Sequence, residues 1–111
     1  MEIALREEKN IHIVTVSGKL DAVSVRDFDE KIQGLLESGA LKMLFRLESL
    51  EYISSIGLRS FLQAAKTMKK QKGRIAFSGL QETTAKIFKI AGFYEILGIY
   101  STEEEALAAL V

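Results

Sequence analysis

Short β-type stretches alternate with longer helix-type stretches along this chain, and that order restricts the possible folds more than any other feature. Three apolar stretches are typical of strands, at residues 11–18, 41–47 and 74–78. The segments between them carry apolar residues every three or four positions, as on one face of a helix. A strand–helix–strand–helix–strand order requires right-handed crossovers onto a largely parallel sheet. The sequence therefore predicts an α/β fold.

The expected sheet is mixed, mostly parallel, and has four or five strands. In the β-branched stretch 11–18, Ile11 and Ile13 fall on one face, and His12, Val14 and Val16 fall on the other. Residues 2–7 can add an antiparallel edge, and residues 97–100 a last short strand. Residues 41–47 are almost entirely apolar, as in a central strand covered on both faces.

About four helices are expected beside this sheet. They cover residues 24–38, 55–71, 82–91 and 101–110. The spacing of Ser24 with Asp27, and of Ser101 with Glu104, is typical of capping boxes at the first and last helix. The expected residues just past the other ends are Gly39, Gly73 and Gly92.

Composition excludes several classes of function. Fifteen Lys and Arg balance fifteen Asp and Glu, so no overall field attracts nucleic acid or an anionic membrane. The chain has no cysteine, which agrees with a reducing compartment and excludes zinc–thiolate sites. It also lacks a secretion signal and any run of about 20 apolar residues. We expect one soluble, cytoplasmic domain over residues 1–111 that is monomeric when free, binds no nucleic acid and does not insert into a membrane.

An enzymatic site is not expected. The only histidine, His12, lies in a predicted strand far along the chain from the serines discussed below. No Gly-x-Ser-x-Gly elbow, no carboxylate and histidine cluster with metal-ligand spacing, and no phosphate-binding glycine loop is present. We therefore expect no catalytic residue, no metal and no cofactor.

Two adjacent serines, Ser54 and Ser55, stand where an apolar stretch gives way to the second predicted helix. The positive end of a helix dipole and its unpaired N–H groups suit a phosphate. Phosphorylation adds about −1.5 to −2 charges at neutral pH. Serine is also a favoured N-cap residue, so one of the two is expected to cap the helix, and both roles are compatible. The sequence indicates a switchable binding surface rather than a catalytic pocket.

Three features together resemble the STAS domain family over essentially the whole chain, and most closely its stand-alone bacterial anti-anti-sigma factors. They are the order of elements, two turns and the closing helix; the turns read Gly18-Lys19-Leu20-Asp21-Ala22 and Ser54-Ser55-Ile56-Gly57-Leu58. The second turn of the family usually reads Asp-Ser-Ser/Thr-Gly-Leu. Its first serine is phosphorylated by a serine kinase with a histidine-kinase-like ATPase fold, which is itself the anti-sigma factor.

The resemblance places the phosphorylation site at Ser55, with Ser54 as the second candidate because it replaces the family's Asp. Ile56 replaces the second hydroxyl residue. The resemblance further implies that the unphosphorylated form binds the kinase and frees a sigma factor, that phosphorylation abolishes binding, and that a cognate phosphatase reverses it. The implied partner-binding residues are Asp21, Ser54, Ile56, Gly57 and Arg59.

Several alternatives stay open at this point. Asp21 can equally be a turn or capping residue. Arg46, unusual in its apolar strand, is expected to pair with Glu48 or Glu51, or else to extend to the sheet edge. Because position 54 lacks the Asp, the chain can also be a non-phosphorylated STAS scaffold or a regulatory subunit of a transporter, lipid-trafficking or signalling complex. A nucleotide-binding sensor rests on fold analogy alone.

Overall fold

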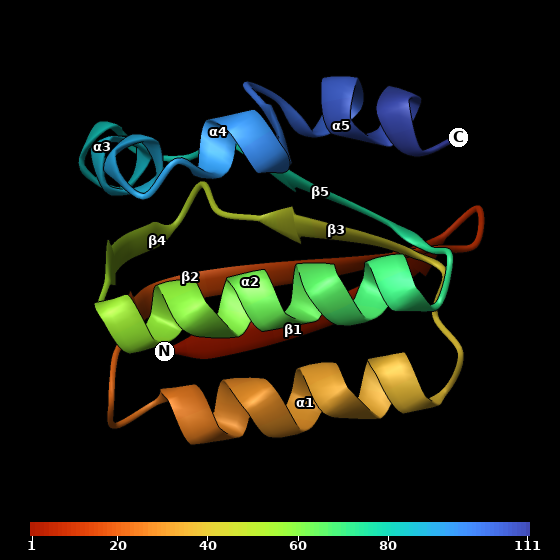
Figure 1. The fold of residues 1–111 in the computed structure, drawn as a ribbon, viewed down its shortest axis with the longest axis horizontal. Helices are drawn as coiled ribbons and strands as arrows, with labels where there is room; N and C mark the ends of the chain where they lie inside the picture. Colours follow the sequence, from red (N-terminus) through yellow and green to blue (C-terminus); the bar gives the residue numbers. More distant parts are fainter.

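The strands form one mixed sheet with helices on both of its faces (Figure 1). The computed structural model describes residues 1–111. The strands are β1 (Glu2–Glu8), β2 (Ile11–Leu20), β3 (Lys42–Arg46), β4 (Leu50–Ile53), β5 (Arg74–Ser78) and β6 (Gly98–Tyr100). The helices are α1 (Val25–Glu37), α2 (Ser55–Lys70), α3 (Glu82–Ile90), α4 (Phe93–Ile96) and α5 (Glu103–Leu110).

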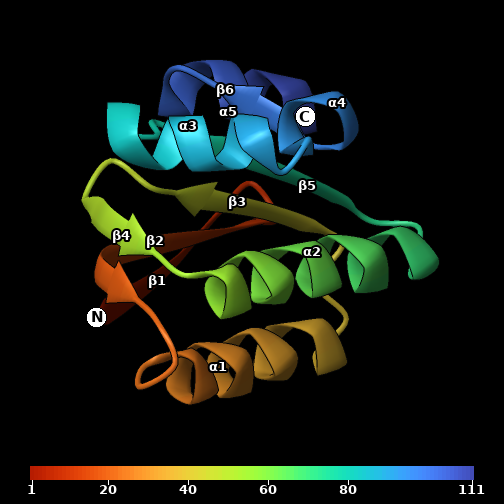
Figure 2. The ribbon, with the colours of Figure 1, turned by 60° about the vertical axis from the view of Figure 1, so that its left-hand side comes forward.

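The sheet has the order β1-β2-β3-β5-β6, in which β1 is antiparallel to β2 and the remaining neighbours are parallel. The predicted α/β class and mostly parallel sheet are confirmed. The structure has six strands and five helices, rather than four or five strands and about four helices. The additional elements are β4, which pairs with the end of β2 (Figure 2), and the one-turn helix α4.

A chain of phenylalanine rings joins both crossover helices to the centre of the sheet. Phe61 of α2 lies 5.2 Å from Phe28 of α1 and 5.2 Å from Phe45 of β3, centroid to centroid. Edge-to-face contacts of this kind add to the stabilisation by buried apolar area. On β2, Val14 and Val16 share one face, as predicted, and this face meets the main core. The opposite face of β2 packs under α5, in a smaller cluster.

The capping boxes predicted for the first and last helices are wrong in their details. Ser24 precedes α1, but it makes no side-chain capping hydrogen bond. Its hydroxyl group instead donates to the backbone oxygen of Lys19 at 2.9 Å, within the turn before the helix. At α5 the N-cap is Thr102 rather than Ser101, and it accepts a hydrogen bond from the backbone N–H of Glu105. In the turn before α1, the hydroxyl group of Ser24 is thus engaged within the turn and does not cap the helix.

The end of α2 also differs from the prediction, because Lys72 and not Gly73 adopts the left-handed conformation there (φ 62°). Gly73 is needed for a different reason, since a Cβ atom at this position would clash with the sulfur of Met68 and lie 2.9 Å from the backbone oxygen of Leu41. Gly39 and Gly92, in contrast, do have positive φ values just past their helices, as expected.

Candidate functional site

The two turns singled out in the sequence lie next to each other at one edge of the sheet. The parallel pairing of β2 with β4 aligns Leu20 with Ile53. The backbone N–H of Ser54 donates to the backbone oxygen of Leu20 at 2.9 Å. Asp21 and Ser54 directly follow these paired residues. The turns of residues 18–22 and 54–58 therefore contribute to one surface, which we call the serine edge.

The two serines have different environments. Ser54 is the N-cap of α2, is half-buried, and accepts a hydrogen bond from the backbone N–H of Gly57 at 3.4 Å. Ser55 is the first residue of the helix and is exposed. No side-chain hydrogen bond involves its hydroxyl group. The capping role expected for one serine therefore belongs to Ser54, whereas the hydroxyl group of Ser55 is accessible and has no hydrogen-bond partner in the protein.

Asp21 organises the turn between β2 and α1. Its carboxylate accepts hydrogen bonds from the backbone N–H groups of Val23 (3.0 Å) and Ser24 (3.2 Å), and from the hydroxyl group of Ser24 (3.2 Å). The N–H of Ser24, followed by these other donors, holds the pKa of Asp21 below its ordinary value, because each donor favours the ionised form. Asp21 thus has the turn role that the sequence left open, and its ionised carboxylate is held within the turn that adjoins Ser54.

Gly57 supports the serine edge from beneath. It is buried, and a Cβ atom there would lie 2.8 Å from Cγ1 of Ile53 and 3.1 Å from the backbone oxygen of Leu20. Only glycine lets the first turn of α2 lie this close to the paired ends of β2 and β4. Because Gly57 is buried, any effect on a partner is through the position of the helix.

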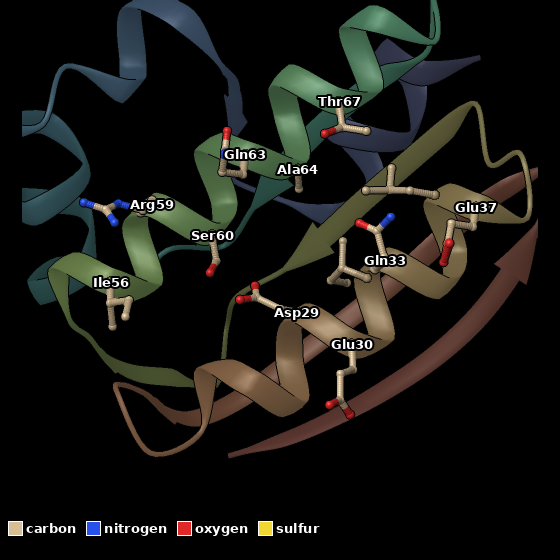
Figure 3. Close-up of a pocket in the computed structure, with 12 residues that line it drawn as sticks. Asp29, Glu30, Gln33, Glu37, Ile56, Arg59, Ser60, Gln63, Ala64 and Thr67 are labelled. Carbon is tan, nitrogen blue, oxygen red and sulfur yellow. The ribbon is translucent and has the colours of Figure 1, made fainter.

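Ile56 and Arg59, the other predicted partner-binding residues, are exposed on the first turns of α2. Both line a groove between α1 and α2 (Figure 3). The groove has a volume of about 730 Å³ and is open to solvent. It extends the serine edge along the helical layer of the molecule.

Comparison with known proteins identifies the family of this chain. The model of the STAS domain family matches residues 2–106. The chain belongs to the STAS domain family. It is 29% identical over 104 residues to the anti-sigma-B factor antagonist of Bacillus subtilis, covering 94% of each chain. Anti-sigma factor antagonists therefore stand among the relatives of this STAS domain.

Solved structures share the fold. An anti-sigma factor antagonist from Mycobacterium paratuberculosis matches with a TM-score of 0.91 and 19% identity, over 98% of this chain and 92% of that one. The phosphorylated form of the Bacillus cell fate determinant SpoIIAA matches with a TM-score of 0.78 and 22% identity, over 99% and 100% of the two chains. At this identity the likeness concerns the arrangement of the backbone.

Two apolar residues of the STAS domain's serine edge were missed by the sequence reasoning. Val23, two residues after Asp21, is 91% exposed, and Tyr52, two residues before Ser54, is 47% exposed. Exposed large apolar side chains can belong to a contact surface. The exposure of Val23 could have been predicted from its position in a turn, outside the periodic pattern of α1.

Arg46 lies on the opposite side of the STAS domain's sheet, under α5. Its Nε atom lies 2.6 Å from Oε1 of Glu103 and 3.8 Å from Oε1 of Glu48. The Nε–H group makes no hydrogen bond, so the contact with Glu103 is an ion pair. The predicted pairing with Glu48 is confirmed, Glu51 takes no part, and the shorter contact is with a residue that the sequence did not indicate. Arg46 therefore helps to hold α5 and not the serine edge.

No helix of the STAS domain is both long and apolar enough to cross a membrane. No group of three or more His, Cys, Asp or Glu side chains is placed to hold a metal ion.

Proposed function

We propose that this STAS domain is an anti-sigma factor antagonist in a partner-switching module. Its unphosphorylated form binds an anti-sigma serine kinase with a histidine-kinase-like ATPase fold and so frees a sigma factor. Phosphorylation of Ser55 abolishes that binding, and a cognate phosphatase restores it. The module would act in the cytoplasm, where sigma factors work. The observation that carries the proposal is the exposed, unbonded hydroxyl group of Ser55 at the start of α2, beside the charged turn of Asp21.

Ser55 is a better acceptor than Ser54 on structural grounds. A kinase must reach the hydroxyl oxygen, and the side chain of Ser55 is exposed. The hydroxyl oxygen of Ser54 is half-buried and accepts the capping hydrogen bond from Gly57. Phosphate on Ser54 would have to replace that cap, whereas phosphate on Ser55 leaves it in place. The solved forms of SpoIIAA include a phosphorylated and an unphosphorylated one, which supports a phosphate switch in a protein of this fold.

The effect of the phosphate follows from its charge and position. The helix N-terminus stabilises an anion by about 0.3–1 kcal/mol, so the host domain stays folded. A partner that docks on the serine edge must remove water from the exposed side chains there, among them Ile56. A doubly charged phosphate inside that surface loses hydration unless the partner offers cations. Each 1.4 kcal/mol so lost weakens binding about tenfold.

Mass spectrometry of phosphopeptides tests this function. Serine kinases of this class from the same genome are incubated with the protein and ATP, and the wild type is compared with Ser55→Ala and Ser54→Ala. We expect one phosphate on Ser55, lost only in Ser55→Ala. Ser55→Asp should keep the melting temperature of the wild type. It should lose affinity for the kinase that binds the unphosphorylated protein. Phosphate on Ser54, or unchanged affinity of Ser55→Asp, would contradict the proposal.

A second candidate function is a constitutive scaffold or regulatory subunit of a transporter, lipid-trafficking or signalling complex. It is favoured by one observation, the hydroxyl group at position 54 where the family motif has an Asp. A carboxylate there could help a kinase to orient the neighbouring serine. Consistent absence of phosphate in protein isolated from its native cell, under growth and under stress, would support the scaffold.

A further inference from the structure

The groove between α1 and α2 continues directly from the serine edge (Figure 3). Ile56 and Arg59 stand at the end of the groove nearest Ser55 and belong to both surfaces. The floor is made by buried apolar residues, Ile32, Leu36 and Ala64. The positions of α1 that line it run from residue 29 to residue 37, about 12 Å at 1.5 Å per residue. That length suits about two turns of a partner's helix.

The α1 wall of the groove is acidic and mostly unpaired. It carries the carboxylates of Asp29, Glu30 and Glu37. Asp29 and Glu37 make no ion pair. Glu30 approaches only Arg26, at 3.7 Å, and both of these side chains are largely exposed. An exposed pair of this kind contributes little, so the negative charge of the wall remains available.

The α2 wall offers one cation, Arg59, and a row of neutral polar side chains. Ser60, Gln63 and Thr67 line the groove, and no side-chain hydrogen bond involves any of them. Figure 3 shows Asp29 and Ser60 pointing toward one another across the groove. The groove thus combines an apolar floor, free hydrogen-bonding groups and a net negative charge.

We propose that this groove binds a lysine- or arginine-bearing helix of the same partner that docks on the serine edge. The inference rests on the proposed function, because it assigns a second contact to that partner. Two features support it: the groove is continuous with the serine edge through Ile56 and Arg59, and its unpaired carboxylates complement a cationic segment. The helix would place small apolar residues on Ile32 and Leu36 and direct its cations toward Asp29, Glu30 and Glu37.

This second contact has a distinct role in recognition. Complementary charge raises the association rate and rejects partners of the wrong sign. The acidic wall belongs to α1, whereas the phosphate would be added at the start of α2. The groove therefore selects which kinase binds, and the phosphate on Ser55 decides when it is released.

The test measures how tightly the kinase that phosphorylates the wild-type protein binds to two double variants. Both variants change the net charge of the protein by the same amount. Asp29→Lys/Glu30→Lys reverses the acidic wall. Glu95→Lys/Glu104→Lys is the control, because both side chains are exposed, make no ion pair, and lie on α4 and α5, neither of which lines the groove. We expect about tenfold or greater loss of affinity for the groove variant, mainly in the association rate, and a change within about twofold for the control.

Further variants separate the possible outcomes. Asp29→Asn/Glu30→Gln removes charge without reversing it and should give an intermediate loss. Melting curves check that each variant is folded. Binding of the groove variant within about twofold of wild type, or equal weakening in the control, would overturn the inference while Ser55→Asp still loses affinity and the proposed function stands. If no kinase binds or phosphorylates the wild type, the proposed function fails, and the groove inference fails with it.

Discussion

Replacing each of the two serines by alanine should affect different properties of the protein. Ser54→Ala removes the oxygen that accepts from the N–H of Gly57. Loss of an N-cap typically costs about 1 kcal/mol, and the 3.4 Å separation places this one nearer 0.5–1 kcal/mol. With about 2.1 cal/mol/K of unfolding entropy per residue, that loss lowers the melting temperature of a chain of this length by about 2–4 °C. Ser55→Ala removes no hydrogen bond and should stay within about 0.5 kcal/mol of wild type.

Thermal and urea unfolding followed by circular dichroism would measure both differences. Ser54→Asp is the matched control, since a carboxylate at the N-cap accepts the same hydrogen bond and restores the residue typical of the family. It should unfold within about 1 °C of the wild type. A destabilisation of Ser55→Ala equal to that of Ser54→Ala, or no effect of Ser54→Ala, would contradict the assignment of the cap to Ser54.

Three other measurements address the surrounding structure. A double-mutant cycle between Arg46 and Glu103 should give a coupling of about 1 kcal/mol, since both side chains are partly exposed; no coupling would show that the pair does not hold α5. Gly57→Ala should lower the free energy of unfolding by about 1–2 kcal/mol, because overpacking against Ile53 exceeds the gain in helix propensity; a stable variant would mean that α2 can shift. The pKa of Asp21 is lowered on folding, so the advantage of wild type over Asp21→Asn should be present above about pH 4 and decline as the pH falls through the lowered pKa; a difference independent of pH in urea unfolding would contradict this.

Local sequence pattern was sufficient for the long elements and insufficient for the short ones. The helical stripe of α2 and the two faces of β2 each extend over ten residues or more, so the periodic signal accumulates. β4 has only four residues, and it becomes a strand because the end of β2 offers it free hydrogen-bonding groups. The single turn of α4 follows Gly92, a left-handed N-cap residue that the sequence indicated only as the end of α3.

Residue patterns were enough to predict the α/β class, the strand-to-helix junction that carries the two serines, and the resemblance to the STAS family. The fold had to be known to assign the cap to Ser54, to find Ser55 exposed, and to place the turn of Asp21 next to theirs. It also decided that Arg46 meets Glu103, and that an acidic groove continues from the serine edge. The physical reason is that apolar periodicity reports which face of an element is buried. The register of β4 on β2, and the separation of α1 from α2, depend instead on contacts between residues distant in the sequence.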